Sequence, residues 1–161
     1  MSVESLDHSL LRVGKPTYIE PRLARRVWSI NVLLVEDDAA DTALILDVLK
    51  RHPDVSAARA SDTPDDALRE LADGRSRPDL VLLDIHMPRI DGFEFLRRMR
   101  RIPEMADVPV VFLTSSRLPS DVAKAWRSSP TSYVIKPETH AELQNRLDSV
   151  IRRTISGTRT R

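Results

Sequence analysis

Residues 78–84 read Pro78-Asp79-Leu80-Val81-Leu82-Leu83-Asp84, a short apolar run that ends in a carboxylate. An uninterrupted run of Leu and Val is typical of a parallel strand that is buried on both faces of its sheet. Asp84 is therefore expected where a central strand leaves the core, at the edge where open α/β sheets bind ligands. A carboxylate at that place must be solvated, paired or bound to a cation.

Three other apolar runs also end in polar or charged side chains: residues 31–35 precede Glu36 and Asp37, residues 108–113 precede Thr114, and residues 132–135 precede Lys136. The carboxyl ends of parallel strands meet at one edge of a sheet, so we expect these side chains to share a cleft with Asp84. Carboxylate oxygens in this number suit Mg²⁺. Several carboxylates with one Lys are typical of a phosphoryl site, where the metal and the ammonium neutralise charge and a hydroxyl donates a hydrogen bond.

Helical patterns alternate with these strands. Apolar residues at three- and four-residue spacing predict a helix after the acidic turn that ends near His52-Pro53, and others around Phe93 to Met99 and around Leu118, Val122 and Trp126. A shorter strand is expected around residues 55–60. The predicted fold class is α/β, a doubly wound five-stranded parallel sheet of (βα)5 flavodoxin-like order.

Two helix starts carry capping signals. Thr63 is expected to cap a helix through its hydroxyl, with Pro64 at the first helical position and an end at Gly74. Thr139 and Glu142 have the spacing of a capping box for the last helix.

Taken together, the strand ends resemble the receiver domains of two-component response regulators. The resemblance extends over about residues 29–151 and rests on elements that occur in the family's order and spacing: Glu36-Asp37, Asp84, Thr114 and Lys136. It implies the receiver fold and a phosphoprotein whose Asp84 accepts a phosphoryl group from a sensor histidine kinase or phosphotransfer protein in a Mg²⁺-dependent reaction.

The resemblance also implies a role for each remaining position. Asp37 corresponds to a direct metal ligand, and Glu36 to an acid that reaches the metal through water. The backbone carbonyl of His86 completes the implied metal set with Asp84. Lys136 is implied to pair with the phosphoryl group, and Thr114 and Tyr133 to form the switch that reports phosphorylation.

Several of these residues have a structural interpretation as well. Glu36, Asp37 and Asp38 can be an acidic N-terminal run on the first helix, and for Asp38 capping is the favoured interpretation. Thr114 can cap the following segment, and Tyr133 can be a core aromatic. Gly92 resembles the turn glycine after the acceptor loop, and we expect it to be needed for backbone freedom.

The chain divides into an N-terminal extension (1–28), the receiver region (29–151) and a basic C-terminal tail (152–161). Residues 31–151 carry 16 basic and 21 acidic side chains, whereas the first 30 residues have a net charge of +2 and the last ten +4. This distribution argues against a nucleic-acid partner. The apolar content of residues 1–28 predicts that they pack on the domain or exchange with a second copy, and a mobile arm is the alternative.

The sequence contains no stretch of 18 apolar residues, no signal-peptide pattern and no Cys. We therefore expect a cytoplasmic protein that has no membrane partner, no disulfide and no Cys-based metal site. Ten residues after the last helix leave no room for an output domain, which predicts a single-domain regulator that signals through its own surface.

The resemblance implies a homodimer formed through the fourth-helix and fifth-helix face. The acidic turn at residues 35–41 is similar to that of stand-alone receivers that serve phytochrome-type kinases. A phosphorylation-independent pseudo-receiver that acts as an interaction module remains the alternative. A haloacid-dehalogenase-like phosphatase is disfavoured because His86 occupies the position of its second Asp. Nucleotide-binding α/β folds are disfavoured because the four glycines form no phosphate loop.

Overall fold

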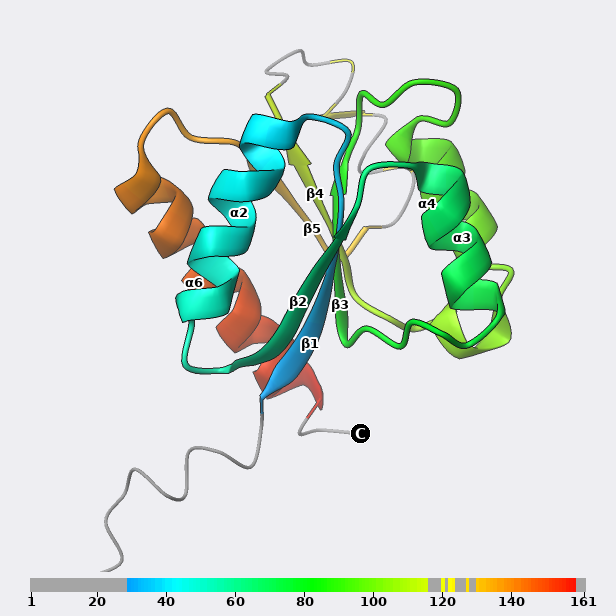
Figure 1. Cartoon of the computed structure of the whole chain (residues 1–161), viewed down its shortest axis with the longest axis horizontal. Helices are drawn as coiled ribbons and strands as arrows, with labels where there is room; N and C mark the ends of the chain where they lie inside the picture. Colours follow the sequence, from blue (N-terminus) through cyan, green and yellow to red (C-terminus); the bar gives the residue numbers. More distant parts are fainter. Residues whose placement is uncertain (1–28, 116–119, 121, 124–126, 128–129, 159–161) are drawn as a thin grey trace, which may run out of the picture.

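The structure is a computed structural model, and it describes residues 29–115, 120, 122–123, 127 and 130–158. A parallel sheet of five strands forms its centre, in the order β2-β1-β3-β4-β5 (Figure 1). The strands are β1 (Ile30–Val35), β2 (Val55–Ser61), β3 (Leu80–Asp84), β4 (Val110–Thr114) and β5 (Ser132–Ile135). The predicted α/β class and flavodoxin-like strand order are confirmed.

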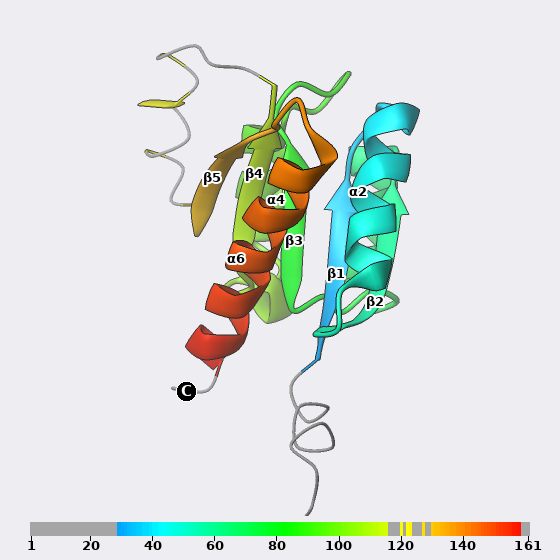
Figure 2. The same cartoon turned by 90° about the vertical axis from the view of Figure 1, so that its left-hand side faces the viewer.

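Two layers of helices enclose the sheet: α2 (Ala39–Arg51), α3 (Pro64–Ala72), α4 (Gly92–Met99) and α6 (His140–Thr158), with a short 3₁₀ helix, η2 (Pro103–Met105). Figures 1 and 2 show α2 and α6 on one face of the sheet and α3 and α4 on the other. Of the fourth predicted helix, Leu118 and Trp126 lie outside the described residues. Residues 1–28 and 159–161 lie outside them as well.

The central strand β3 explains why its sequence is a continuous apolar run. Val81 and Leu83 belong to the apolar cluster under α3 and α4, whereas Leu80 and Leu82 belong to the cluster under α2 and α6. All four side chains are fully buried. Every position of a strand covered on both faces must be apolar, so the alternation seen in half-exposed strands is lost. The edge strand β2, by contrast, is half-exposed along its length.

Two of the predicted helix caps are confirmed. The carboxylate of Asp38 accepts hydrogen bonds from the backbone N–H groups of Ala40 and Asp41, at 2.9 and 2.8 Å. The hydroxyl of Thr139 accepts from the N–H of Glu142 at 3.3 Å. Both contacts satisfy donors that a helix N-terminus otherwise leaves unpaired.

The predicted hydroxyl cap of α3 is wrong, although the helix begins at Pro64 as expected. The Thr63 hydroxyl makes no capping bond and donates instead to the carboxylate of Asp66. An acid three residues after the cap position offers a charged acceptor, which competes with the backbone for the hydroxyl. The helix ends at Ala72, and Gly74 follows with a φ of 68°, a left-handed value that favours glycine.

Within the described residues, no helix combines the length and the apolar character that crossing a membrane requires.

Candidate functional site

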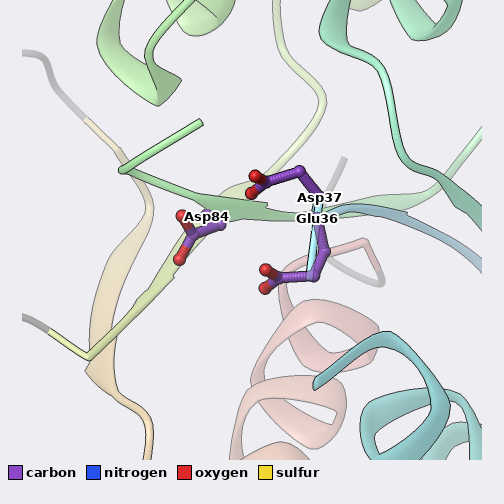
Figure 3. A group of neighbouring side chains, drawn as sticks. All are labelled: Glu36, Asp37 and Asp84. Carbon is purple, nitrogen blue, oxygen red and sulfur yellow. The ribbon is translucent and has the colours of Figure 1, made fainter. Parts of the chain in front are cut away.

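The strand ends meet at the carboxyl edge of the sheet, as the sequence predicts. Glu36 and Asp37 follow β1, and Asp84 ends the neighbouring strand β3. Figure 3 shows the carboxylates of Glu36 and Asp37 on the side of their segment that faces Asp84. Each of the three offers an oxygen, and these oxygens lie within 4.8 Å of one another. Glu36 and Asp84 are buried, whereas Asp37 is exposed.

Lys136 brings one positive charge into this group of acids. Its ammonium lies 2.6 Å from Oε2 of Glu36, 2.7 Å from Oδ2 of Asp41 and 3.1 Å from Oδ1 of Asp84. Its backbone N–H donates to the carbonyl of Thr114 at 2.8 Å, which ties the end of β5 to the end of β4. An ammonium has three N–H donors, and three carboxylates surround this one.

The pKa values of Glu36 and Lys136 are both raised, but for different reasons. Burial is the largest influence on Glu36 and raises the pKa of its carboxyl, although the hydrogen bond from Lys136 acts against it. Burial alone would lower the pKa of Lys136, but the hydrogen bonds that its ammonium donates to Asp41 and Glu36, together with the negative charges of Asp84 and Glu36, outweigh burial and raise that pKa. Lys136 is therefore held as a cation at neutral pH.

The backbone around Asp84 fixes the orientation of its side chain. Oδ2 of Asp84 accepts a hydrogen bond from the N–H of His86 at 2.7 Å, which leaves Oδ1 facing Lys136. The N–H of Gly92 donates to the carbonyl of Ile85 at 2.9 Å, so the segment that opens α4 folds back onto the end of β3.

Gly92 is required for a different reason from the one predicted. Its φ is not in the left-handed region, so backbone freedom is the wrong explanation. A Cβ at this position would lie 2.4 Å from the carbonyl oxygen of Asp84 and 3.0 Å from the Cα of Ile85. The glycine is needed because backbone approaches backbone, whereas the left-handed residue of this loop is Arg89, with a φ of 67°.

The two predicted switch residues, Thr114 and Tyr133, lie in strands of the sheet next to the carboxylates and Lys136. Thr114 ends β4, is completely buried and pairs in register with Ile135. Tyr133 is half-buried, pairs with Phe112 and packs against the apolar cluster under α3 and α4. Their roles in switching remain predictions, as does the use of the His86 carbonyl.

The site contains one residue that the sequence prediction did not assign to it, namely Asp41. It lies in the first turn of α2, and its side chain is 37% exposed. An acid at that helical position is favourable with the helix dipole, so the sequence offers an ordinary structural interpretation for it. The signal that distinguishes Asp41 is its contact with Lys136, which is separated from it by 95 residues.

The donor set fits a hard divalent cation. Three carboxylates whose oxygens converge are ligands of the kind that Mg²⁺ and Mn²⁺ prefer. Glu36, Asp37, Asp41 and Asp84 outnumber the single ammonium of Lys136, so the group keeps excess negative charge when its carboxylates are ionised. Such an excess beside a low-dielectric interior attracts a cation. Its exposed member, Asp37, lines an open hollow with Thr63, Asp66 and Arg89.

The comparison with known families agrees with this geometry. Residues 32–148 match the family described as the response regulator receiver domain. This protein belongs to the response regulator receiver family. Among curated relatives, the transcriptional regulatory protein AfsQ1 of Streptomyces coelicolor is 37% identical over 124 residues, which cover 76% of this chain and 52% of AfsQ1. Response regulator Rcp1 of Synechocystis is 32% identical over 127 residues, which cover 70% of this chain and 80% of Rcp1.

The chain thus spans about half the length of AfsQ1. It spans a smaller part of the relatives that are methylesterases, and the match covers 27% of the one from Syntrophus aciditrophicus. Receiver domains are signalling modules that also occur within longer enzymes and regulators. The activities of those longer proteins belong to them and are not assigned to this chain.

Solved structures of receivers share the fold. The phosphorylated cyanobacterial phytochrome response regulator RcpA matches with a TM-score of 0.69 and 27% identity, over 76% of this chain and 91% of that one. The Mn²⁺-bound form of Rcp1 matches with a TM-score of 0.66 and 28% identity, over 75% and 91%. The receiver domain of the histidine kinase PA1611 from Pseudomonas aeruginosa, with magnesium in its active-site cleft, matches with a TM-score of 0.66 and 26% identity, over 80% and 98%.

Proposed function

We propose that this protein is a phosphoacceptor of two-component signalling, in which Asp84 receives a phosphoryl group from a phosphohistidine. The observation that carries the proposal is the placement of the Lys136 ammonium 3.1 Å from Oδ1 of Asp84, next to converging oxygens of Glu36 and Asp37. This arrangement offers a nucleophilic carboxylate together with the charges that a phosphoryl group requires.

Mg²⁺ bound by Asp37 and Asp84, with Glu36 and the His86 carbonyl nearby, would supply positive charge to the phosphoryl oxygens. An oxygen of Asp84 attacks phosphorus and forms the acyl-phosphate O–P bond, while the P–N bond to the donor imidazole breaks. The electron pair of that bond stays on the imidazole nitrogen, which is left to take up a proton from solvent. Lys136 stabilises charge on the transferred group, and positioning supplies most of the acceleration.

Phosphorylation is then read out through Thr114 and Tyr133. The Thr114 hydroxyl turns toward the new phosphoryl oxygens, and Tyr133 follows into the space that is vacated. This movement changes the surface of β5 and α6, which serves as the signalling face and supports a homodimer. The protein acts as a phosphoacceptor and not as an enzyme on other substrates, apart from its own phosphorylation and slow dephosphorylation.

The protein acts in the cytoplasm, and its partner is a sensor histidine kinase or a phosphotransfer protein. The similarity to Rcp1 and to RcpA, which is described as a phytochrome response regulator, favours a kinase of the phytochrome type. Residues 1–28 form an extension outside the receiver region. The basic segment predicted as a tail from residue 152 begins within α6, which continues to Thr158, so residues 152–158 belong to the domain. Removing residues 1–26 and measuring the mass in solution and the unfolding midpoint tests whether the extension packs; an unchanged dimer of unchanged stability would contradict packing.

The central test is incubation with acetyl phosphate and Mg²⁺, followed by the intact mass of the protein. We expect one phosphoryl adduct on the wild type, none on Asp84→Asn, and none when the metal is chelated. Asp79→Asn is a matched control because Asp79 directly precedes the opposite end of β3, where its carboxylate accepts a hydrogen bond from the N–H of Asn31. If no adduct depends on Asp84, the phosphorylation-independent interaction module becomes the better assignment.

A further inference from the structure

Asp41 differs from the other acids of the site in where it comes from. Glu36, Asp37 and Asp84 are supplied by the ends of strands, whereas Asp41 is a helical residue of α2. Its own N–H donates to the capping carboxylate of Asp38 at 2.8 Å, so the first turn of the helix holds its backbone. Its Oδ2 accepts a hydrogen bond from the ammonium of Lys136 at 2.7 Å.

The ammonium of Lys136 depends on contacts with carboxylates for its position. The backbone of Lys136 is fixed by its bond to Thr114, but four rotatable methylene groups separate that backbone from the ammonium. Glu36 and Asp84 also contact the ammonium, at 2.6 and 3.1 Å. Both of these acids belong to the group whose oxygens converge within 4.8 Å, and Asp41 does not.

This difference matters once a divalent cation occupies the site. Glu36 and Asp84 then share their negative charge with the metal, so their attraction for Lys136 is weakened. Asp41 keeps its full charge for the ammonium because it lies outside the converging group. Among the three carboxylates that surround Lys136, Asp41 is therefore the one that can hold it both with and without metal.

We propose that Asp41 is a positioning residue for phosphoryl transfer, which holds the Lys136 ammonium beside Oδ1 of Asp84. The inference rests on the proposed phosphoacceptor function. Asp41 does not touch the reacting atoms; it presets the cation that stabilises charge on the transferred group. In a reaction dominated by positioning and electrostatics, a cation that must be ordered during the reaction contributes less than one already in place.

The first experiment measures the rate of phosphorylation by acetyl phosphate at saturating Mg²⁺. In this reaction Asp84 forms its O–P bond, the P–O bond of the donor breaks, and acetate leaves with the electron pair. We expect Asp41→Ala to be slowed about fivefold, as for the loss of one charge-assisted contact. Asp41→Asn, whose amide oxygen still accepts a hydrogen bond, should be slowed less. Asp47→Ala, which removes an acid from the same helix, should react like the wild type.

A double-mutant cycle separates action through Lys136 from direct repulsion of the phosphodonor. If Asp41 acts through Lys136, Asp41→Ala has no further effect on the rate in a Lys136→Met background. If Asp41 instead acts by electrostatic repulsion of acetyl phosphate, Asp41→Ala changes the rate by the same factor in the Lys136→Met background as in the wild type. Mg²⁺ affinity, measured by calorimetry, should fall much less for Asp41→Ala than for Asp37→Asn, because Asp41 contributes charge to the site but lies outside the converging carboxylates.

A readout independent of phosphorylation is the Lys136 ammonium itself. Its ¹⁵N resonance should show slow proton exchange with water in the wild type and exchange at least about fivefold faster in Asp41→Ala, because one of its partners is lost. An adduct on the wild type with unchanged rate and exchange in Asp41→Ala overturns this inference alone. Absence of an Asp84-dependent adduct on the wild type overturns the proposed function instead.

Discussion

Among the described residues, two groups of ion pairs that link segments far apart in the sequence differ clearly in burial. At the carboxyl edge of the sheet, Lys136 contacts Glu36 and Asp84, whose side chains are 2% and 8% exposed. At the contact between α2 and α6, Asp148 contacts His52 at 3.1 Å and Arg152 at 2.8 Å, and its side chain is 38% exposed.

The difference in burial gives the two groups different chemistry. Water solvates Asp148 and Arg152, so their pairing adds little to stability and is screened by salt. In the buried group, each charge depends on its neighbours, and the carboxylates exceed the ammonium in number. The exposed group connects two helices, whereas the buried group stays electrostatically incomplete and suits a cation.

Removing the buried cation should have the largest effect on stability. Lys136→Met leaves Glu36 buried without its counter-charge, so we expect the free energy of unfolding to fall by about 3 kcal/mol in metal-free buffer, as for a broken buried pair. Arg152→Met, which removes the cation of the exposed group, should change it by less than about 0.5 kcal/mol. Urea unfolding measures both, and equal losses would show that burial does not separate the two groups.

Adding the proposed metal should stabilise only the buried group. At a Mg²⁺ concentration of about 100 times the dissociation constant, linkage predicts a gain of about 2.7 kcal/mol for the wild type. Asp37→Asn should reduce this gain strongly, because Asp37 offers one of the three converging oxygens. Asp148→Asn should leave it unchanged. Thermal unfolding at a series of Mg²⁺ concentrations tests the contrast, and a gain that survives Asp37→Asn would place the metal elsewhere.

Glycine substitutions test the backbone beneath the buried group. Gly92→Ala should destabilise by about 2 kcal/mol, because the new Cβ would lie 2.4 Å from the carbonyl oxygen of Asp84 and the loop would have to move. Gly157→Ala is the matched control in α6, where a Cβ meets nothing within 4 Å, and helix propensity predicts a gain of about 0.5 kcal/mol or less. A destabilisation of similar size at both positions would contradict the close approach.

The exposed group should produce a small dependence of stability on pH. The hydrogen bond from Arg152, and after it that from His52, holds the pKa of Asp148 below its ordinary value of 3.8. The stabilisation is therefore present above pH 3.8 and is lost as the pH falls through the lower, folded-state pKa. Comparing wild type and Asp148→Asn by urea unfolding between pH 6 and roughly 2 should reveal a difference below about 1 kcal/mol that vanishes at the acid end.

The sequence predicted the fold because its signals are local and strong. The apolar run into Asp84 can be satisfied only by a strand covered on both faces, and helical patterns on either side require a doubly wound sheet. The capping positions of Asp38 and Thr139 follow from side chains that act within three residues. The hydroxyl cap of Thr63 failed because Asp66, equally local, is a stronger acceptor.

The residues of the site that follow the ends of strands could be predicted from the sequence, because the topology of a parallel sheet brings them together. Parallel strands must end at one edge, so the meeting of Glu36, Asp37, Asp84 and Lys136 follows from the order of the strands alone. The contact of Asp41 does not follow from it, because a helical residue reaches Lys136 only through the angle at which α2 packs on the sheet. Packing angles arise from many side chains together, and no short pattern encodes them.

The sequence by itself thus determined the fold class, the edge at which chemistry gathers and the residue types delivered there. Only the tertiary structure decided how one ammonium is shared among Glu36, Asp41 and Asp84 and why residue 92 has no side chain. The physical reason is that periodicity and strand ends are properties of a chain segment. Distances between charges and clashes between backbones depend instead on how segments far apart in the sequence pack against one another.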